Sequence, residues 1–303
     1  MALITTGGIS ALLGPSYRKV YIETGKERPL EYVLVANVSE MPFNPASDQQ
    51  MTGLSTMPAK PQGRAFALDD IKTGGSKTYT ATAFGLAVEV TFEAWRDELY
   101  GVLEEMVKGL ARAARNRQEV QFWAIFNDAF TGSTYTGFNS VALCSTSQTA
   151  ITGGGAAAGA NRPSPDIGFS VTGIQNSITR FEGMTDERGM PRLMSPTMAL
   201  IHYSNKFVAR EILGSGGKPY TAHNEINALI EEDLSWMVGH YITTSTNWWM
   251  LAPKGIHDLN FMWRDYEIFD MFDDPLTKTA IACNYMRFAE GFGSWRGIDG
   301  STG

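Results

Sequence analysis

Residues 91–130 read TFEAWRDELYGVLEEMVKGLARAARNRQEVQFWAIFNDAF, and this stretch decides the fold. It contains no proline, and its only glycines are Gly101 and Gly109. Its apolar residues recur at the spacing of one buried helix face, at Leu99, Val102, Leu103, Met106, Val107, Leu110, Ala113, Ala114, Val120, Trp123, Ile125 and Phe126. We therefore predict one long helix over about residues 99–130, roughly 48 Å long at ~1.5 Å per residue.

The charges of this stretch are ordered along it. Acidic residues come first and basic residues follow, as Glu93, Asp97, Glu98, Glu104 and Glu105 and then Lys108, Arg112, Arg115 and Arg117. This order suits the helix macrodipole, which favours negative charge near the N-terminus and positive charge near the C-terminus. Glu104 precedes Lys108 by four positions, the spacing of a stabilising pair on one helix face.

A loop and a strand precede the predicted helix. Residues 41–78 hold four of the chain's 13 prolines, among many glycine and small polar residues. Such a segment favours extended or turn structure, and a loop of this length is either functional or disordered. We interpret it as an arm that reaches a neighbouring subunit, with a surface excursion as the plain alternative. Alternation over residues 76–92, which changes face near Gly85, predicts one long returning strand that bends there.

The first 40 residues are predicted to form an extended arm. Gly7, Gly8, Gly14 and Pro15 interrupt any long element, and the apolar residues around Tyr32 and Leu34 indicate one short strand. This N-terminus also lacks the basic and apolar regions of a signal peptide, so none is expected.

Shorter elements are predicted after the long helix. Small residues within 131–165 indicate a loop, and apolar spacing over 171–181 predicts an amphipathic helix capped by Ser170 and stopped by Gly183. Further predicted elements are a buried strand at 197–203, helices at 204–213 (capped by Ser204) and 224–230, and strands at 234–243, 248–251, 259–263, 266–271 and around 281–285. Because strands and helices do not alternate regularly, an α+β fold is favoured over a doubly wound sheet.

Composition excludes several classes of protein. The 303 residues carry a net charge of −7, and no segment is strongly basic, so a sequence-reading DNA-binding domain is not expected. Two cysteines, Cys144 and Cys283, make neither a disulfide framework nor a CxxC site, which favours a reducing compartment. No apolar run approaches the ~18 residues that span a bilayer, so no membrane contact is predicted.

Candidate chemistry is sparse. The histidines, none at metal-ligand spacing, are His202, His223, His240 and His257. Residues 74–78 and 214–218 resemble phosphate loops, but each departs from the motif. In the first, Ser76 replaces the required glycine; after the second, Pro219 replaces the required serine or threonine. Asp270, Asp273 and Asp274 could bind a cation, with a polar hairpin turn as the alternative. The sequence therefore predicts no catalytic, cofactor-binding or metal-binding residue.

The order of segments along nearly the whole chain matches the pattern of a known protein family. Four segments match this pattern. They are the strand at 86–92, the Ala-Arg-rich residues 110–117 followed by Gln121-Phe122-Trp123, the strand-to-helix stretch 196–213, and the C-terminal residues Tyr285-Met286-Arg287-Phe288 with Gly293-Ser294-Trp295-Arg296-Gly297. The chain resembles the HK97-type major capsid proteins of tailed bacteriophages, and within them is similar to the Mu-like major head subunits.

The resemblance implies an HK97-like division of the chain. Residues 1–44 would form the N-terminal arm and 45–82 the extended loop. Residues 83–132 and 259–287 would form a peripheral domain with the spine helix, and residues 133–258 and 288–303 an axial domain. Some members of the family join a loop lysine to a neighbouring asparagine, and Lys60, Lys72 and Lys77 are the candidates here, without a motif match.

The implied function is assembly and not catalysis. Subunits would form pentamers and hexamers of an icosahedral head around double-stranded DNA, contacting neighbours through the loop and arm. Implied partners are a separate scaffolding protein, a portal, a decoration protein and non-specifically bound DNA. The resemblance also implies that the protein assembles in the host cytoplasm and then forms part of the virion. An encapsulin-like cellular compartment and a metal-dependent enzyme using Asp270, Asp273 and Asp274 are the alternatives.

Overall fold

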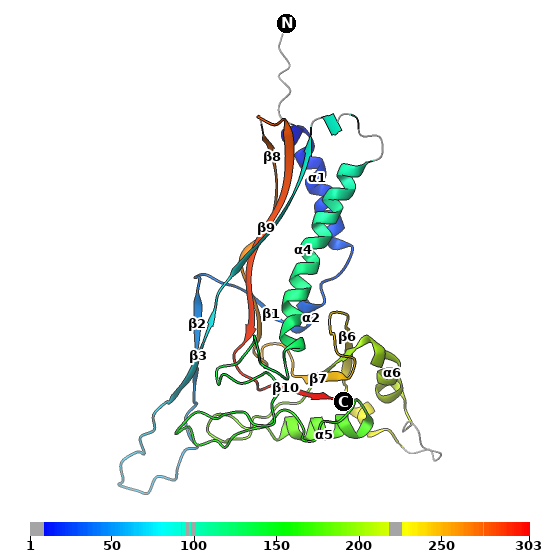
Figure 1. Cartoon of the computed structure of the whole chain (residues 1–303). Coiled ribbons are helices and arrows are strands. Elements are labelled where there is room, and N and C mark those ends of the chain that lie inside the picture. The colour runs from blue at the N-terminus through cyan, green and yellow to red at the C-terminus, as the bar shows by residue number, and fades with distance from the viewer. Residues whose placement is uncertain (1–8, 92, 95–96, 98–100, 218–225, 275) are drawn as a thin grey trace.

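The computed structural model describes residues 9–303 apart from 92, 95–96, 98–100, 218–225 and 275. The chain has a tall part and a broad base (Figure 1). The tall part holds α1 (Ile9–Lys26), α2 (Tyr32–Val35), β1 (Asn37–Glu40), β4 (Thr82–Thr91), α4 (Val102–Asn127), β8 (Leu259–Asp274) and β9 (Thr279–Phe292). The base holds α5 (Val171–Glu182), β5 (Met198–His202), α6 (Lys206–Gly214), β6 (Ser235–Gly239), β7 (Asn247–Leu251) and β10 (Ile298–Thr302). The hairpin of β2 (Ala46–Met51) and β3 (Thr73–Tyr79) extends from the side.

The predicted long helix is confirmed as α4, with 26 residues. It begins after Gly101, whose positive φ of 69° suits glycine, and it ends at Asp128. It is thus shorter than predicted at both ends, and residues 98–100 lie outside the described residues. Of the predicted apolar face, Val107, Leu110, Ala114, Trp123, Ile125 and Phe126 are buried. Met106, Ala113 and Val120 were predicted on the same face but are exposed, and Phe122 is buried although it was not predicted there.

The prediction of an extended arm is wrong over residues 9–26, which form α1. The helix contains Gly14 and Pro15 and packs along α4 and β8. Tyr21 is buried and stacks on Phe269 of β8 with a ring-centroid distance of 4.7 Å. Most helical stability in proteins comes from such tertiary packing, which here outweighs unfavourable local residues.

The short strand predicted around Tyr32 and Leu34 is also wrong, because these residues form α2. The carboxylate of Glu119 accepts hydrogen bonds from the backbone amides of Glu31 (2.5 Å) and Tyr32 (3.2 Å). These amides open the helix and have no partner within it, so the carboxylate stabilises its first turn. A strand begins only after α2, at Asn37, as β1, which pairs in parallel with β8.

The returning strand breaks at residues 80–81 and not at Gly85. Before the break β3 pairs with β2, and after it β4 pairs with β9 without a register shift from Thr82 to Thr91. Ala81 is buried, and its amide donates to Asn44 Oδ1 at 3.0 Å. The strand therefore changes partner where the side hairpin joins the tall part, which explains the wrong prediction.

Two four-stranded sheets organise the molecule, in the orders β1-β8-β9-β4 and β10-β7-β5-β6. Helix α4 packs against β9 and β4 of the first sheet, and α5 packs against β10 of the second. β8 is one strand with register shifts between Trp263 and Ile268, where two strands were predicted. The mixture of helices and sheets confirms the predicted α+β class.

Several smaller predictions are confirmed, and one is wrong. Ser170 caps α5 by accepting from the Gly173 amide at 3.1 Å, and Gly183 ends that helix. The expected cap at Ser204 is wrong, since its own amide donates to His202 Nδ1 at 3.1 Å. Where a helix was predicted at 224–230, residues 224–225 lie outside the described residues and a 3-10 helix covers Ala228–Glu232.

Adjacent tryptophans of β7 join two hydrophobic cores. Trp249 packs with Trp123, Phe126 and the residues of the tall part, whereas Trp248 packs with α5 and α6 residues such as Phe181. Successive residues of a strand point to opposite faces of the sheet, and each face is covered by one of the two cores. Both tryptophan side chains are therefore fully buried. Among the described helices, none has the length and apolar character needed to cross a membrane.

Candidate assembly surfaces

The loop between β2 and β3 exposes an unusual number of large apolar side chains. Met57 is 92% exposed and Leu68 is 98% exposed. Leu54, Phe66 and Ile71 are exposed on the same segment. Single exposed apolar residues are common, but a group of them on one projecting segment marks an interaction site. Figure 1 shows this loop reaching away from the base.

The hairpin of β8 and β9 has one covered face and one exposed face. On the covered face, Phe269 and Ala282 belong to a core with Val107 and Leu110 of α4. On the other face, the cross-strand pairs are Ile268 with Tyr285 and Phe272 with Ile281. Ile268, Phe272 and Tyr285 are between 41% and 56% exposed, so this face is a second apolar surface.

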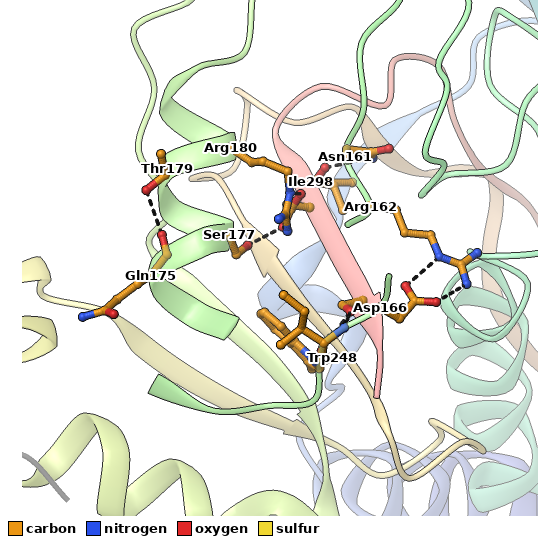
Figure 2. A network of polar contacts seen from close by, with 12 residues as sticks. Asn161, Arg162, Asp166, Gln175, Ser177, Thr179, Arg180, Trp248 and Ile298 are labelled. Atoms are coloured by element: carbon orange, nitrogen blue, oxygen red, sulfur yellow. Dashed lines mark hydrogen bonds and ion pairs between the residues drawn. The ribbon is translucent and has the colours of Figure 1, made fainter. Parts of the chain in front are cut away.

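Buried polar contacts fix the C-terminal strand in the base. Asp299 of β10 is fully buried and accepts from Arg180 Nε at 3.0 Å and Nη2 at 2.7 Å, and also from the Ser177 hydroxyl. Figure 2 shows Ser177 and Arg180 pointing from α5 toward the strand that carries Ile298. A buried charge is tolerated only when it is paired and hydrogen-bonded, as here.

The polar network continues on the other side of β10. Asn161 Nδ2 donates to the carbonyl oxygens of Leu143 (2.7 Å) and Ile298 (3.0 Å). Arg162 binds both carboxylate oxygens of Asp166, at 2.9 and 2.6 Å (Figure 2). The segment predicted as a loose loop at 131–165 is therefore held to the base by specific hydrogen bonds.

The candidate aspartates do not form a metal centre in the structure. Asp270 and Asp273 lie along β8, and Asp274 caps the hairpin turn by accepting from the Leu276 amide at 2.9 Å. This hydrogen bond is the main reason that the pKa of Asp274 is lowered. Within the described part of the chain, no three His, Cys, Asp or Glu residues are grouped to hold a metal ion. The polar-turn interpretation therefore accounts for Asp274.

The loop lysines have separate environments. Lys60 lies over the Phe66 ring at 4.3 Å, and Lys72 pairs with Asp70 at 2.5 Å. Lys77 donates to the Thr136 carbonyl at 2.8 Å, and burial lowers the pKa of its amine. Of the three, Lys60 contacts an aromatic ring of its own loop, whereas Lys72 and Lys77 contact oxygen atoms.

The histidines and cysteines occupy mostly structural positions. His202 and His257 are buried, and His223 lies outside the described residues. His240 is exposed and pairs with Glu31. Cys144 is buried, and neither cysteine forms a disulfide. Residues 74–78, the first phosphate-loop resemblance, lie in β3, and the second continues into residues outside the described part.

Sequence reasoning missed three charged residues that hold elements together. Glu119 binds α2, Arg188 binds the long loop, and Arg296 forms a buried ion pair with Glu187. Their partners are distant in sequence, so no local spacing could have identified them. The one usable signal was Glu119, a carboxylate that interrupts the basic second half of the long helix.

Comparison with known proteins supports one family. A family model described as "Phage capsid protein" matches residues 75–298. No curated protein matches the chain by sequence. The fold is similar to a solved structure from Microbacterium phage Oxtober96, with a TM-score of 0.55, 10% identity and 91% of each chain covered.

Two further solved structures have a similar fold. The mature capsid of bacteriophage PhiM1 has a TM-score of 0.56 at 10% identity, covering 89% of this chain and 86% of that one. The procapsid of bacteriophage JBD30 has a TM-score of 0.50 at 13% identity, covering 97% of this chain and 74% of that one. At such identities the likeness concerns the fold alone.

Proposed function

This chain belongs to the phage capsid protein family, and we propose that it builds its head shell from pentamers and hexamers that enclose double-stranded DNA. It is a major capsid protein with an HK97-like fold, a structural component of the virion. The family match over residues 75–298 carries this conclusion, and it favours a phage head over an encapsulin-like compartment. The similarity to Mu-like head subunits stays a prediction.

The proposed division of labour within the subunit follows the two sheets. Residues 83–132 and 259–287 form the peripheral domain, and residues 133–258 and 288–303 form the axial domain that packs around the fivefold and sixfold centres. Residues 1–44 act as the arm and 45–82 as the extended loop. The core that α5 and α6 share with one face of β5 supports a separate axial unit. The other core joins α4, β8 and β9 to residues of β5 and β7, so it connects the two proposed domains.

The loop contacts a neighbouring subunit in this proposal. Its large apolar side chains are exposed, Met57 and Leu68 most of all, and none of them belongs to the hydrophobic cores of the described residues. The exposed hairpin face that carries Phe272 and Tyr285 offers a surface of the same chemistry. Burying each large apolar side chain at such an interface is worth about 1.5–3 kcal/mol. Many such weak contacts close a symmetric shell.

Other partners are proposed on the family resemblance. They are a separate scaffolding protein and a portal during assembly in the host cytoplasm, and a decoration protein on the finished head. The net charge of −7 supports only loose, non-specific contact with packaged DNA, because tight binding requires clustered cations.

Electron microscopy tests the proposal directly. We expect the purified full chain, expressed with its scaffold, to form closed shells or isolated pentamers and hexamers in negative stain. A protein that stays monomeric under every condition would contradict shell formation. Shells that enclose a cargo protein and no DNA when isolated from the natural host would point to the compartment alternative.

Changing one loop residue tests the proposed neighbour contact. We expect Leu68→Ser to slow shell formation at least tenfold in light scattering, because its side chain would no longer be buried against the neighbour. The control is Leu193→Ser, since Leu193 is 96% exposed but lies outside the loop. Equal assembly rates for Leu68→Ser and the wild type would show that the loop does not make the contact.

A further inference from the structure

A rigid turn after α5 presents one arginine to the extended loop. Asp186 Oδ1 accepts from the backbone amides of Arg188 (2.8 Å) and Met190 (2.9 Å), which closes the turn. Gly189 adopts a φ of 82° there, and Thr185 bridges to Pro191. The turn therefore holds the backbone of Arg188 in one position, and the Arg188 side chain is only 12% exposed.

The guanidinium of Arg188 contacts both legs of the loop. Nε donates to the Gly53 carbonyl oxygen at 2.9 Å on the outgoing leg. On the returning leg, Nη2 pairs with Asp69 Oδ1 at 3.2 Å and donates to the Asp70 carbonyl oxygen. The planar guanidinium donates to the two legs from different nitrogen atoms, whereas an ammonium group donates from a single nitrogen.

Asp69 is itself held in place by the opposite leg. Its Oδ2 accepts from the Ser55 amide at 2.7 Å and from the Ser55 hydroxyl at 2.9 Å. These hydrogen bonds lower the pKa of Asp69, with the charge of Arg188 acting in the same direction. The carboxylate is therefore ionised at neutral pH and available to the guanidinium.

A second link fixes the base of the same hairpin. Gln50 Nε2 donates to Glu187 Oε1 at 2.5 Å, and Glu187 pairs with Arg296. The Arg296 side chain is 5% exposed, and its Nε donates to the Thr185 carbonyl at 2.6 Å. Strand β2 is thus tied to the same turn that presents Arg188, so the turn defines where the loop leaves the subunit.

We propose that Arg188 is a positioning residue for assembly: it clamps residues 53 and 69–70 to the 184–192 turn and so directs the exposed apolar part of the loop toward the neighbouring subunit. The inference rests on the proposed loop contact and deepens it. The clamp exists within one subunit, so the loop is directed before a neighbour arrives. Preorganisation of this kind lowers the ordering cost of association.

Hydrogen exchange on the full chain, kept below the concentration at which shells form, tests the clamp. Across the two legs, the Thr52 amide donates to the Lys72 carbonyl and the Lys72 amide donates to the Thr52 hydroxyl, each at 2.9 Å. We expect Arg188→Ala to speed exchange of these two amides at least tenfold, without moving the thermal midpoint of either core. Arg188→Lys should behave like Arg188→Ala, because charge alone cannot bridge both legs. The control is Arg192→Ala, whose Nη2 donates to the Ile256 carbonyl and not to the loop. Unchanged exchange in Arg188→Ala, or wild-type exchange in Arg188→Lys, would overturn the proposal.

Assembly kinetics separate this inference from the proposed function. We expect both Arg188 variants to form shells at least tenfold more slowly than the wild type and Arg192→Ala. Wild-type assembly rates in variants whose loop exchange is fast would refute the positioning role. If the wild type itself formed no shells, the proposed function would fail, while the exchange measurement would still decide whether the clamp exists.

Discussion

At the scale of single residues, His257 gives the clearest pH dependence. It is buried, and burial lowers its pKa to about 4, with the charge of Lys254 acting in the same direction. The unfolded chain binds this proton near pH ~6.5. The stability that His257 contributes is therefore complete above pH ~6.5 and is lost as the pH falls toward 4, by at most about 1.4 kcal/mol per pH unit.

Replacing His257 should remove this dependence. We expect His257→Gln to lose less stability than the wild type between pH 6.5 and 4.5, as measured by urea unfolding at a series of pH values. A comparison at pH 7.5 separates this effect from the general cost of the substitution. Parallel stability curves for the two proteins over that pH interval would show that His257 is not the titrating group.

The residues that hold elements together were the hardest to predict. Glu119 accepts from Tyr32, which is 87 positions away in the chain, and Arg188 contacts Gly53 across 135 positions. Each was an ordinary charged residue in its local sequence. Only the fold brings their partners within reach, so the sequence could mark Glu119 as unusual in its helix but could not show which residues Glu119 or Arg188 contacts.

At the scale of elements, those elements could be predicted whose stabilising residues are close together in the sequence. The apolar period of α4 and the cap at Ser170 of α5 are local signals, and both elements were predicted. Helix α1 was missed because Gly14 and Pro15 oppose it locally, whereas Tyr21 finds its partner Phe269 on the distant hairpin. Long-range packing decided that element, and one sequence does not show it.

The turn that follows α4 depends on one carboxylate. Asp128 accepts from the amides of Ser133 (2.9 Å), Thr134 (2.7 Å) and Tyr135 (2.8 Å) and from the hydroxyls of Thr131 and Ser133. Burial alone would raise the pKa of Asp128, but these hydrogen bonds outweigh it and hold the pKa far below its usual range. Its contribution to stability is therefore present above pH ~4 and lost as the pH falls below it.

Removing this carboxylate should loosen the turn after the helix. We expect Asp128→Ala to lower the free energy of unfolding by about 1–3 kcal/mol, because the turn loses hydrogen bonds to a charged group. The control is Glu104→Ala at the other end of α4, which removes a surface pair with Lys108 worth about 0.5 kcal/mol or less. Urea unfolding at pH 7 measures both, and an equal loss for the two variants would show that Asp128 is not the anchor of this turn.

At the scale of the whole molecule, the tall part and the base are joined through β7, while the loop stands outside both cores. Trp248 and Trp249 place the two cores on opposite faces of one sheet, so neither core is complete without β7. The side hairpin meets the body through β3, β9 and the 184–192 turn. A subunit built in this way keeps a rigid body and offers its apolar loop residues to another subunit.

The balance of charge and apolar surface predicts how assembly responds to salt. Every subunit carries a net charge of −7, so subunits repel one another, and the exposed loop residues are mainly apolar. Raising the salt concentration from ~0.05 M to ~0.5 M shortens the Debye length from about 14 Å to about 4 Å. This screening weakens the repulsion between subunits and does not weaken apolar contacts. We therefore expect faster shell formation at the higher salt concentration in light scattering, and a similar relative gain for Leu68→Ser, which leaves the net charge unchanged. Shells that dissociate as salt is added would instead show that ion pairs between subunits dominate the interface.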